Sequence, residues 1–130
     1  MIALGIGCRR NASVDDIEAV IVQVLSAASL SADAVSLVAT ESGKADEPGL
    51  VEAARRLGRA VVGIVPSELA KVSDQAVTRS ERVQRLKGVP SVAETAALAA
   101  IAPGGRLIVP RVANAVATCA LARDDAEPAA

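Results

Sequence analysis

The sequence of 130 residues contains no histidine, phenylalanine, tyrosine or tryptophan. Without histidine there is no Ser-His or Cys-His nucleophile pair, so an acid or base working near neutral pH must be a carboxylate, a lysine or a cysteine. Without aromatic rings there is no stacking platform for nucleic acid bases, and a net charge of -1 supplies no positive field for phosphates. These absences exclude a hydrolytic triad and argue against nucleic acid as a partner.

Cysteines and long apolar runs are also scarce. Cys8 and Cys119 are far apart and form neither a disulfide framework nor a zinc-binding pattern. No apolar run approaches the roughly 20 residues that span a bilayer, and Arg9 and Arg10 follow the apolar start of the chain, whereas the basic residues of a signal peptide precede it. We therefore expect a cytoplasmic protein that uses no membrane, metal or cofactor.

The composition favours one folded domain. Hydrophobic residues make up 52% of the chain and charged residues 22%, which is enough apolar side chain to build a core. No internal repeat is visible. Residues 1–123 are predicted to form the domain, and the acidic residues 124–130, which show no apolar period, are predicted to be a flexible tail.

Strands and helices alternate along the first half of the sequence. Short β-branched or apolar runs predict strands, and apolar residues at helical spacing after an N-cap predict helices. The predicted strands are 2–6, 34–39 and 60–65, and the predicted helices are 13–28 and 46–57. Residues 60–65 are continuously apolar, which is typical of a strand buried on both faces.

The second half is more varied. Residues 66–70 predict a short helix and 71–90 a surface loop with one or two helical turns. Ser91 and Glu94 form a capping-box pattern that starts a helix rich in small residues. Two final strands, 106–110 and 115–122, are joined by too few residues for a parallel crossover. The sequence therefore predicts a three-layer α/β/α sandwich with a mixed, mainly parallel sheet of about five strands, the last pair antiparallel.

Ligands of such sheets collect at the carboxyl ends of the parallel strands, beside helix N-termini that favour anions. Arg9 and Arg10 lie there, directly before a helix whose dipole they oppose, so local stability does not explain them. Guanidinium groups bind carboxylates and phosphates bidentately, which predicts a polyanion clamp. A solvated pair is the alternative. Gly5-Ile6-Gly7-Cys8 lacks the third glycine of a dinucleotide loop, so a nucleotide site is disfavoured.

The loop at 40–47 is the second candidate. Thr40 and Lys44 with Asp46 and Glu47 could contact a ligand, and the two carboxylates could act as an acid/base pair or only cap the next helix. Cys8 could have a lowered pKa beside the arginines, or be a buried filler. Residues 80–82 could fold over the site as a lid or form a solvated turn.

The sequence resembles the family of CobE proteins and the C-terminal domain of the cobalt-precorrin-5A hydrolase CbiG, over about residues 2–123. The motifs that carry the resemblance are GIGCRR at 5–10, TxxxKADEPGL at 40–50, SERV at 80–83, GVPSVAE at 88–94, and LIVPR and NAVATCALAR at the end. One departure is the turn 111–114, which is shorter than is common in the family and puts a ligand contact at that turn in doubt.

The resemblance implies a role in building the corrin ring of vitamin B12. The leading hypothesis is a module that binds a precorrin or corrin through its carboxylates, with Arg9, Arg10 and Lys44 pairing with them and Asp46 and Glu47 positioning polar groups. A second hypothesis is an enzyme, or enzyme subunit, for a hydrolytic or rearrangement step such as the lactone opening of CbiG. A third is an interaction module that binds other enzymes of the pathway.

Overall fold

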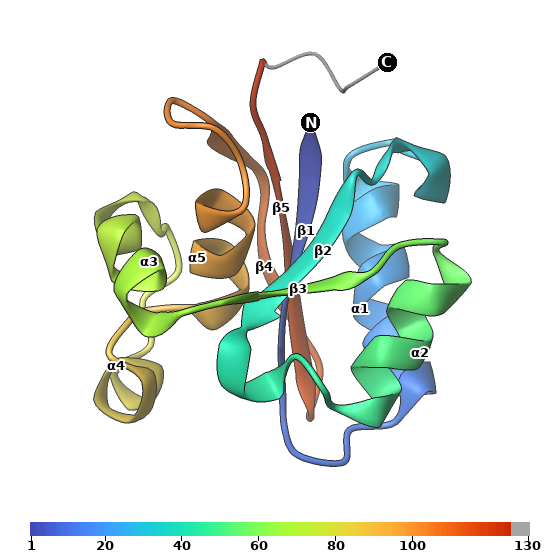
Figure 1. Ribbon diagram of the computed structural model, residues 1–130, viewed down its shortest axis with the longest axis horizontal. Helices are drawn as coiled ribbons and strands as arrows, with labels where there is room; N and C mark the ends of the chain where they lie inside the picture. Colours follow the sequence, from blue (N-terminus) through green and yellow to red (C-terminus); the bar gives the residue numbers. More distant parts are fainter. Residues whose placement is uncertain (126–130) are drawn as a thin grey trace.

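A five-stranded mixed sheet forms the centre of the computed structural model, which describes residues 1–125 (Figure 1). The strand order is β3-β2-β1-β5-β4, and the first three pair in parallel while β5 is antiparallel to both of its neighbours. The strands are β1 Ile2–Cys8, β2 Leu37–Glu41, β3 Val61–Ile64, β4 Arg106–Ala113 and β5 Ala117–Arg123. The predicted mixed, mainly parallel sheet with an antiparallel last pair is confirmed.

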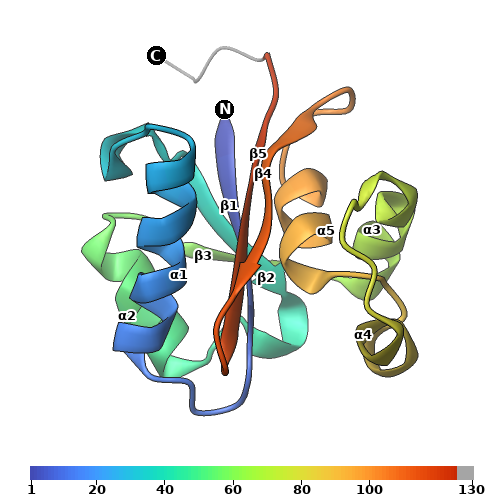
Figure 2. The same ribbon diagram turned by 180° about the vertical axis from the view of Figure 1, so that it is seen from behind.

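Helices cover both faces of this sheet, as Figures 1 and 2 show from opposite sides. Two of them, α1 Val14–Ala27 and α2 Pro48–Arg56, lie on one face. On the other face are α3 Pro66–Lys71, α4 Glu81–Lys87 and α5 Val92–Ala99. Residues 1–125 also contain three short 3-10 turns: η1 Ala32–Ala34, η2 Ser42–Lys44 and η3 Ser73–Gln75. The predicted α/β/α sandwich is therefore correct.

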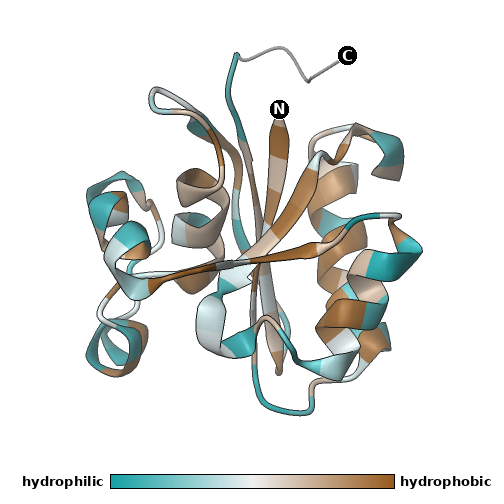
Figure 3. Cartoon of the chain, viewed as in Figure 1, coloured by the Kyte–Doolittle hydropathy of each residue, from teal (hydrophilic) through white to brown (hydrophobic). Residues whose placement is uncertain are grey.

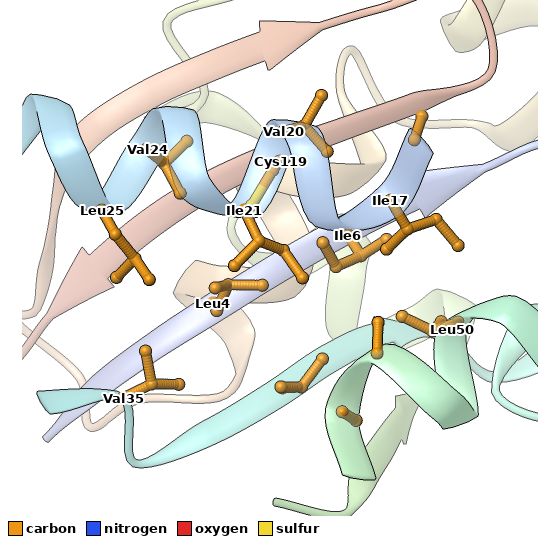
Figure 4. Packing of buried hydrophobic residues seen from close by; sticks show 14 of the residues in the cluster. Leu4, Ile6, Ile17, Val20, Ile21, Val24, Leu25, Val35, Leu50 and Cys119 are labelled. Carbon is orange, nitrogen blue, oxygen red and sulfur yellow. The ribbon is translucent and has the colours of Figure 1, made fainter. Parts of the chain in front are cut away.

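The larger core lies between the sheet and α1. The Ser13 hydroxyl caps this helix by accepting a hydrogen bond from Asp16 N at 3.1 Å. From there the apolar residues recur at helical spacing, so that one side of α1 faces β1 and β5 (Figure 4). The fully buried members include Leu4, Ile6, Ile17, Val20, Val24 and Cys119. This packing fixes the orientation of β1 and therefore the position of the loop that follows it.

On the opposite face α5 packs against β1 at very short range. Gly5 makes this approach possible, because a Cβ there would lie 2.7 Å from Ala97 N and would collide with Ala93 O. Ala93 and Ala97 are themselves fully buried. The small-residue pattern predicted close helix packing here, and the structure confirms it. The N-terminus of α5 is thereby held against the sheet near the carboxyl end of β1.

Three details differ from the sequence prediction. The second strand starts at Leu37, because residues 32–34 form a 3-10 turn. The third strand is not buried on both faces: β3 is at the sheet edge, so Val62 is 41% exposed. Glu94 does not complete a capping box, since its carboxylate bonds to other segments.

Figure 3 shows hydrophobic colour along the central strands and hydrophilic colour on the loop after β1.

Asp124, the first residue of the predicted tail, contacts the body of the domain. Asp124 was placed in the tail, but it is 5% exposed and its carboxylate accepts a hydrogen bond from Ala102 N at 2.7 Å. Its other oxygen lies 3.0 Å from Met1 N. These contacts hold Asp124 beside β1, and residues 126–130 of the predicted tail lie outside the described residues. Within residues 1–125, no helix has the length and apolarity to cross a membrane.

Candidate functional site

A cleft of about 410 Å³ opens at the carboxyl end of β1 and β2, between α4 and the β4–β5 hairpin. Its volume falls in the range of small-molecule sites. Four parts of the chain supply its lining: Gly7, Cys8 and Arg9 after β1; Glu41 from β2; Arg82, Val83, Leu86, Lys87 and Val92 from α4 and α5; and Arg111, Ala113, Asn114, Ala115, Val116, Ala117 and Thr118 from the hairpin. The cleft thus lies where the strand directions predicted a ligand site.

The charge of the cleft is strongly positive, although the chain as a whole carries -1. Arg9, Arg82, Lys87 and Arg111 line it, and Glu41 is the acidic residue among them. Lys87 Nζ lies 2.8 Å from Glu41 Oε1, so this lysine is neutralised. Within residues 1–125 the three guanidinium groups form no ion pair. The cleft therefore presents three guanidinium groups that are available to an anion.

The hairpin wall is held rigidly. Asn114 Oδ1 accepts hydrogen bonds from Val116 N and Ala117 N, at 3.0 and 2.9 Å, and so closes the turn. Its Nδ2 donates to Asp16 O at 2.8 Å, which ties the turn to α1. Arg9 N donates to Val116 O at 2.8 Å. These bonds set the backbone of Arg9 against the hairpin and bring the first and last parts of the sheet to one side of the cleft.

The α4 wall is packed much less tightly. Ser80 caps the helix by accepting from Val83 N at 3.2 Å, and Gly88 ends it with φ 77°, a left-handed conformation that glycine adopts readily. No residue of α4 is buried, and Leu86 is 68% exposed. This helix therefore offers the cleft an accessible apolar side chain beside the guanidinium of Arg82.

Comparison with known proteins fits this fold. The family model described as "Cobalamin synthesis G C-terminus" matches residues 2–122. Protein CobE from Sinorhizobium sp. is 30% identical over 121 residues, which are 93% of this chain and 79% of that one. The chain belongs to the CobE/CbiG C-terminal family. This is a family of cobalamin biosynthesis, and the resemblance carried by the sequence motifs is confirmed.

Solved structures of two cobalamin biosynthesis proteins have a similar fold. A crystal structure of CobE, a protein from the cobalamin (vitamin B12) biosynthetic pathway, has a TM-score of 0.89 and 32% identity, covering 98% of this chain and 93% of that one. Cobalamin biosynthesis protein ChiG from Agrobacterium tumefaciens gives 0.75 and 34%, covering 97% and 100%. The cobalt-precorrin-5A hydrolase of Priestia megaterium is 36% identical over 98 residues, 75% of this chain but 26% of the hydrolase. This domain thus spans about a quarter of that enzyme.

The residues predicted as ligand contacts lie at different positions relative to the cleft. Arg9 lines the cleft, whereas Arg10, next in sequence, is exposed outside its lining. Lys44 is half-buried at the end of η2 and near enough to Cys8 to affect the pKa of its thiol. Asp46 is exposed on the same loop. The structure therefore brings Arg9 to the cleft and leaves the other three around it.

Glu47 holds two loops together. It occupies the N-cap position of α2, but its carboxylate makes no capping bond. Instead Glu47 Oε1 accepts a hydrogen bond from Asn11 N at 2.6 Å, and Asn11 has a positive φ of 62°. The carboxylate therefore fixes the loop after β1, in which Arg9 lies, against the loop after β2.

Thr40 is part of the strand pairing in this CobE-family domain. Its side chain is fully buried, and Oγ1 donates to Ile6 O at 2.7 Å, joining β2 to β1. It lies one residue before the end of the strand and does not reach the cleft lining. Thr40, predicted as a ligand contact, therefore has a direct structural bond at this position.

Replacing Thr40 by valine keeps the shape of the side chain and removes this bond. We expect a loss of about 1 kcal/mol in the free energy of unfolding, the usual worth of a buried hydrogen bond. Urea unfolding measures it. Ligand affinity should stay within about twofold of wild type because Thr40 does not line the cleft. A large loss of affinity at unchanged stability would instead make Thr40 a ligand contact.

Cys8 lies in the cleft, but its thiol is not activated. Burial raises its pKa, since it disfavours the charged thiolate; Lys44 opposes this, and the carboxylates of Glu47 and Glu41 reinforce it. The lowered pKa considered for Cys8 is therefore wrong, and a neutral thiol predominates near pH 7. Cys119, fully buried in the core, has its pKa raised well above the ordinary value by the same cause.

Alkylation of Cys8 should follow this direction. The rate with iodoacetamide is expected to climb as pH rises and to reach half its maximum above pH 9.0, because only the thiolate reacts. Cys119 should stay unmodified while the protein is folded. Mass spectrometry of the two cysteine peptides across a pH series measures both rates. A midpoint for Cys8 well below 9.0 would contradict the effect of burial.

Three basic residues of the cleft were not predicted as ligand contacts: Arg82, Lys87 and Arg111. Arg82 lies in the SERV segment, which the sequence left open as a lid or a turn. Arg111 belongs to the turn region for which no ligand contact was predicted, yet it and Asn114 form one wall of the cleft. The sequence signal that could have found them is the basic character of 79–87 and the family motif that ends at Arg111.

Proposed function

We propose that this domain acts in cobalamin biosynthesis by binding a precorrin or corrin intermediate through its carboxylates in the cleft between α4 and the β4–β5 hairpin. The observation that carries the proposal is the convergence there of Arg9, Arg82 and Arg111 without an ion-pair partner among the described residues. Precursors of the corrin ring carry acetate and propionate carboxylates around their rim. Guanidinium groups are the side chains best shaped to bind such groups in pairs.

The apolar lining fits the rest of such a ligand. Val83, Leu86 and Val92 lie on one side of the cleft and Val116 on the other, so the cationic groups alternate with aliphatic surface. A macrocycle with charged side chains has the same mixture of an apolar ring and a polar rim. Because a corrin with its side chains is larger than the cleft, we place one edge of it there, with the remainder over the loop that carries Lys44.

The direct test is a titration with hydrogenobyrinic acid, a stable corrin, followed by its visible absorption. Amino-acid side chains do not absorb visible light, so the visible signal comes from the ligand alone. We expect a saturable spectral change and an affinity that falls as salt is added, because exposed charge pairs are screened. No response of the wild-type protein to any precorrin or corrin would reject the proposal.

Arg9 and Arg10 provide a matched pair of variants in the same titration. Arg9→Ala should weaken binding by about 3- to 10-fold, the worth of one partly exposed charge-assisted contact. Arg10→Ala removes the same charge one residue away, outside the cleft lining, and should change affinity by less than twofold. Equal effects of the two substitutions would show that general charge, and not the cleft, determines affinity.

No catalytic role is proposed for the residues considered for one. The pKa of Cys8 is raised by burial, which makes it a poor nucleophile at neutral pH. Glu47 accepts a backbone hydrogen bond from Asn11, and Asp46 is exposed away from the cleft lining.

A binding domain must still pass its ligand on, so we propose that other enzymes of the pathway are its partners. The free thiols of both cysteines fit the reducing cytoplasm as the location.

A further inference from the structure

Glu94 is a fully buried carboxylate in the first turn of α5. The sequence pattern explains it as half of a capping box, in which it would bond back to Ser91. The structure keeps only one half of that pattern: the Ser91 hydroxyl accepts from Glu94 N at 3.4 Å, while the carboxylate turns to donors elsewhere. A buried carboxylate is costly to desolvate, so its actual partners show what it does.

Four donors surround this carboxylate, and they come from two segments far apart in sequence. Oε1 accepts from Val77 N and Thr78 N, both at 2.9 Å. Oε2 accepts from Thr78 Oγ1 at 2.8 Å and from Arg111 N at 2.9 Å. Both oxygens act only as acceptors, and hydrogen bonds of this kind to a carboxylate are about twice as strong as neutral ones.

The two segments are the supports of the two cleft walls. Thr78 lies two residues before Ser80, whose hydroxyl caps α4 and whose N–H donates to Pro90 O at 3.1 Å. Residues 77–80 are therefore a strap that carries α4 and its Arg82. On the other side, the backbone N–H of Arg111 in β4 donates to the Glu94 carboxylate, and Arg111 is one of the residues that line the cleft.

We propose that Glu94 is the positioning residue of the cleft: its buried carboxylate holds the 77–80 strap through both oxygens and Arg111 through Oε2, so that Arg82 and Arg111 are kept on facing walls. The inference rests on the proposed function for the identity of the ligand. The inference goes beyond the proposed function because it names a residue that contacts no ligand as the one that sets the spacing of the cationic groups. No residue of α4 is buried. The helix is tied to β2 by the ion pair of Lys87 with Glu41, and the strap that precedes it is tied to α5 by the Glu94 carboxylate.

Glu94→Gln tests the inference with almost no change of shape. The amide has one acceptor oxygen in place of two, so its NH2 group must face either the N–H groups of Val77 and Thr78 or that of Arg111, and donor then faces donor. We expect hydrogenobyrinic acid to bind about 5- to 10-fold more weakly. In an Arg111→Ala background the same substitution should cost less than about half of that factor, because one of the two groups that it positions is already gone.

A second readout needs no ligand. Cys8 lies in the cleft under α4, and Cys119 lies in the core, so the ratio of their reaction rates with a disulfide reagent separates opening of the cleft from unfolding of the domain. Glu94→Gln should raise the rate at Cys8 several-fold and so raise the ratio of the Cys8 rate to the Cys119 rate. Val24→Ala, in the core cluster that contains Cys119, is the control for lost stability and should raise the rate at Cys119 through unfolding, which does not raise that ratio.

Thr78→Val serves if Glu94→Gln does not fold, since it removes one of the four hydrogen bonds and leaves the carboxylate in place. It should show the same two effects at smaller size. The inference is overturned if both variants lower the melting temperature but behave like Val24→Ala in the cysteine ratio and bind the corrin as wild type does. If the wild-type protein binds no corrin, the proposed function fails, and the cysteine ratio alone still decides the role of Glu94.

Discussion

Replacing Arg82 and Arg111 together by alanine should weaken binding of hydrogenobyrinic acid by about 10- to 100-fold. The two residues lie on opposite walls of the cleft, and neither guanidinium group forms an ion pair within residues 1–125. A charge-assisted hydrogen bond contributes on the order of 1.5 kcal/mol, or about tenfold in affinity, and less where solvent screens it. Isothermal titration of the double variant measures the loss, and its salt dependence should be weaker than that of the wild type.

The matched control removes two arginines from the same region without touching the cleft. Arg79 and Arg85 lie before and on α4, are exposed, and are absent from the cleft lining. Arg79→Ala with Arg85→Ala lowers the net charge by the same amount, so affinity should change by no more than about twofold to threefold through the general field. If this control loses as much affinity as the cleft variant, the ligand does not bind between α4 and the hairpin.

Gly5→Ala should be the most damaging small substitution in the domain. The added methyl group would collide with backbone atoms of α5, including Ala97 N at 2.7 Å and Ala93 O, and neither a strand nor a helix backbone can move away cheaply. Overpacking of this kind costs about 3 kcal/mol or more. Because α5 also positions Glu94, we expect a poorly folded protein, seen as a large drop in melting temperature by circular dichroism.

Gly43→Ala is the matched control for the same atomic change. Nothing lies within 4 Å of a Cβ built at Gly43, and its φ is not positive, so stability should stay within about 0.5 kcal/mol of the wild type. The contrast between the two glycines separates a packing requirement at β1 from a general cost of losing glycine. A stable, wild-type-like Gly5→Ala protein would mean that α5 does not lie this close to the sheet.

The fold could be predicted because its elements are encoded locally. Helix α1 could be predicted from the helical spacing between Ile17 and Leu25 and from the cap at Ser13. The antiparallel pairing of the last two strands could be predicted because the connection before Ala117 is too short for a parallel crossover. The error at β3 has a different origin: a run of valines is typical both of a central strand and of this edge strand, and only strand order separates them.

The cleft could be predicted only on the side built by β1. Arg9 follows a strand whose end was identified, so its place at the sheet edge could be inferred. Arg82 lies on a polar helix with no apolar period, and nothing local indicates on which side of the domain it packs. The position of Arg111 depends on irregular pairing of β4 with β5, whose register shifts between Val109 and Val112. Such shifts reverse which side chains face a given surface.

Glu94 shows the limit of motif reasoning. Serine followed three residues later by glutamate is the capping-box pattern, and Ser91 does cap α5. The fate of the carboxylate is decided by donors at 77–78 and 111, which the sequence cannot place next to it. Glu47 and Thr40, which were predicted from the sequence as ligand contacts, form hydrogen bonds that hold neighbouring segments together.

The structure of the domain in complex with hydrogenobyrinic acid tests the central claim most directly. We expect one edge of the macrocycle between α4 and the β4–β5 hairpin, with its carboxylate oxygens at hydrogen-bond distance from the guanidinium groups of Arg9, Arg82 and Arg111. A macrocycle bound elsewhere on the domain, with these three groups still facing solvent, would contradict the account.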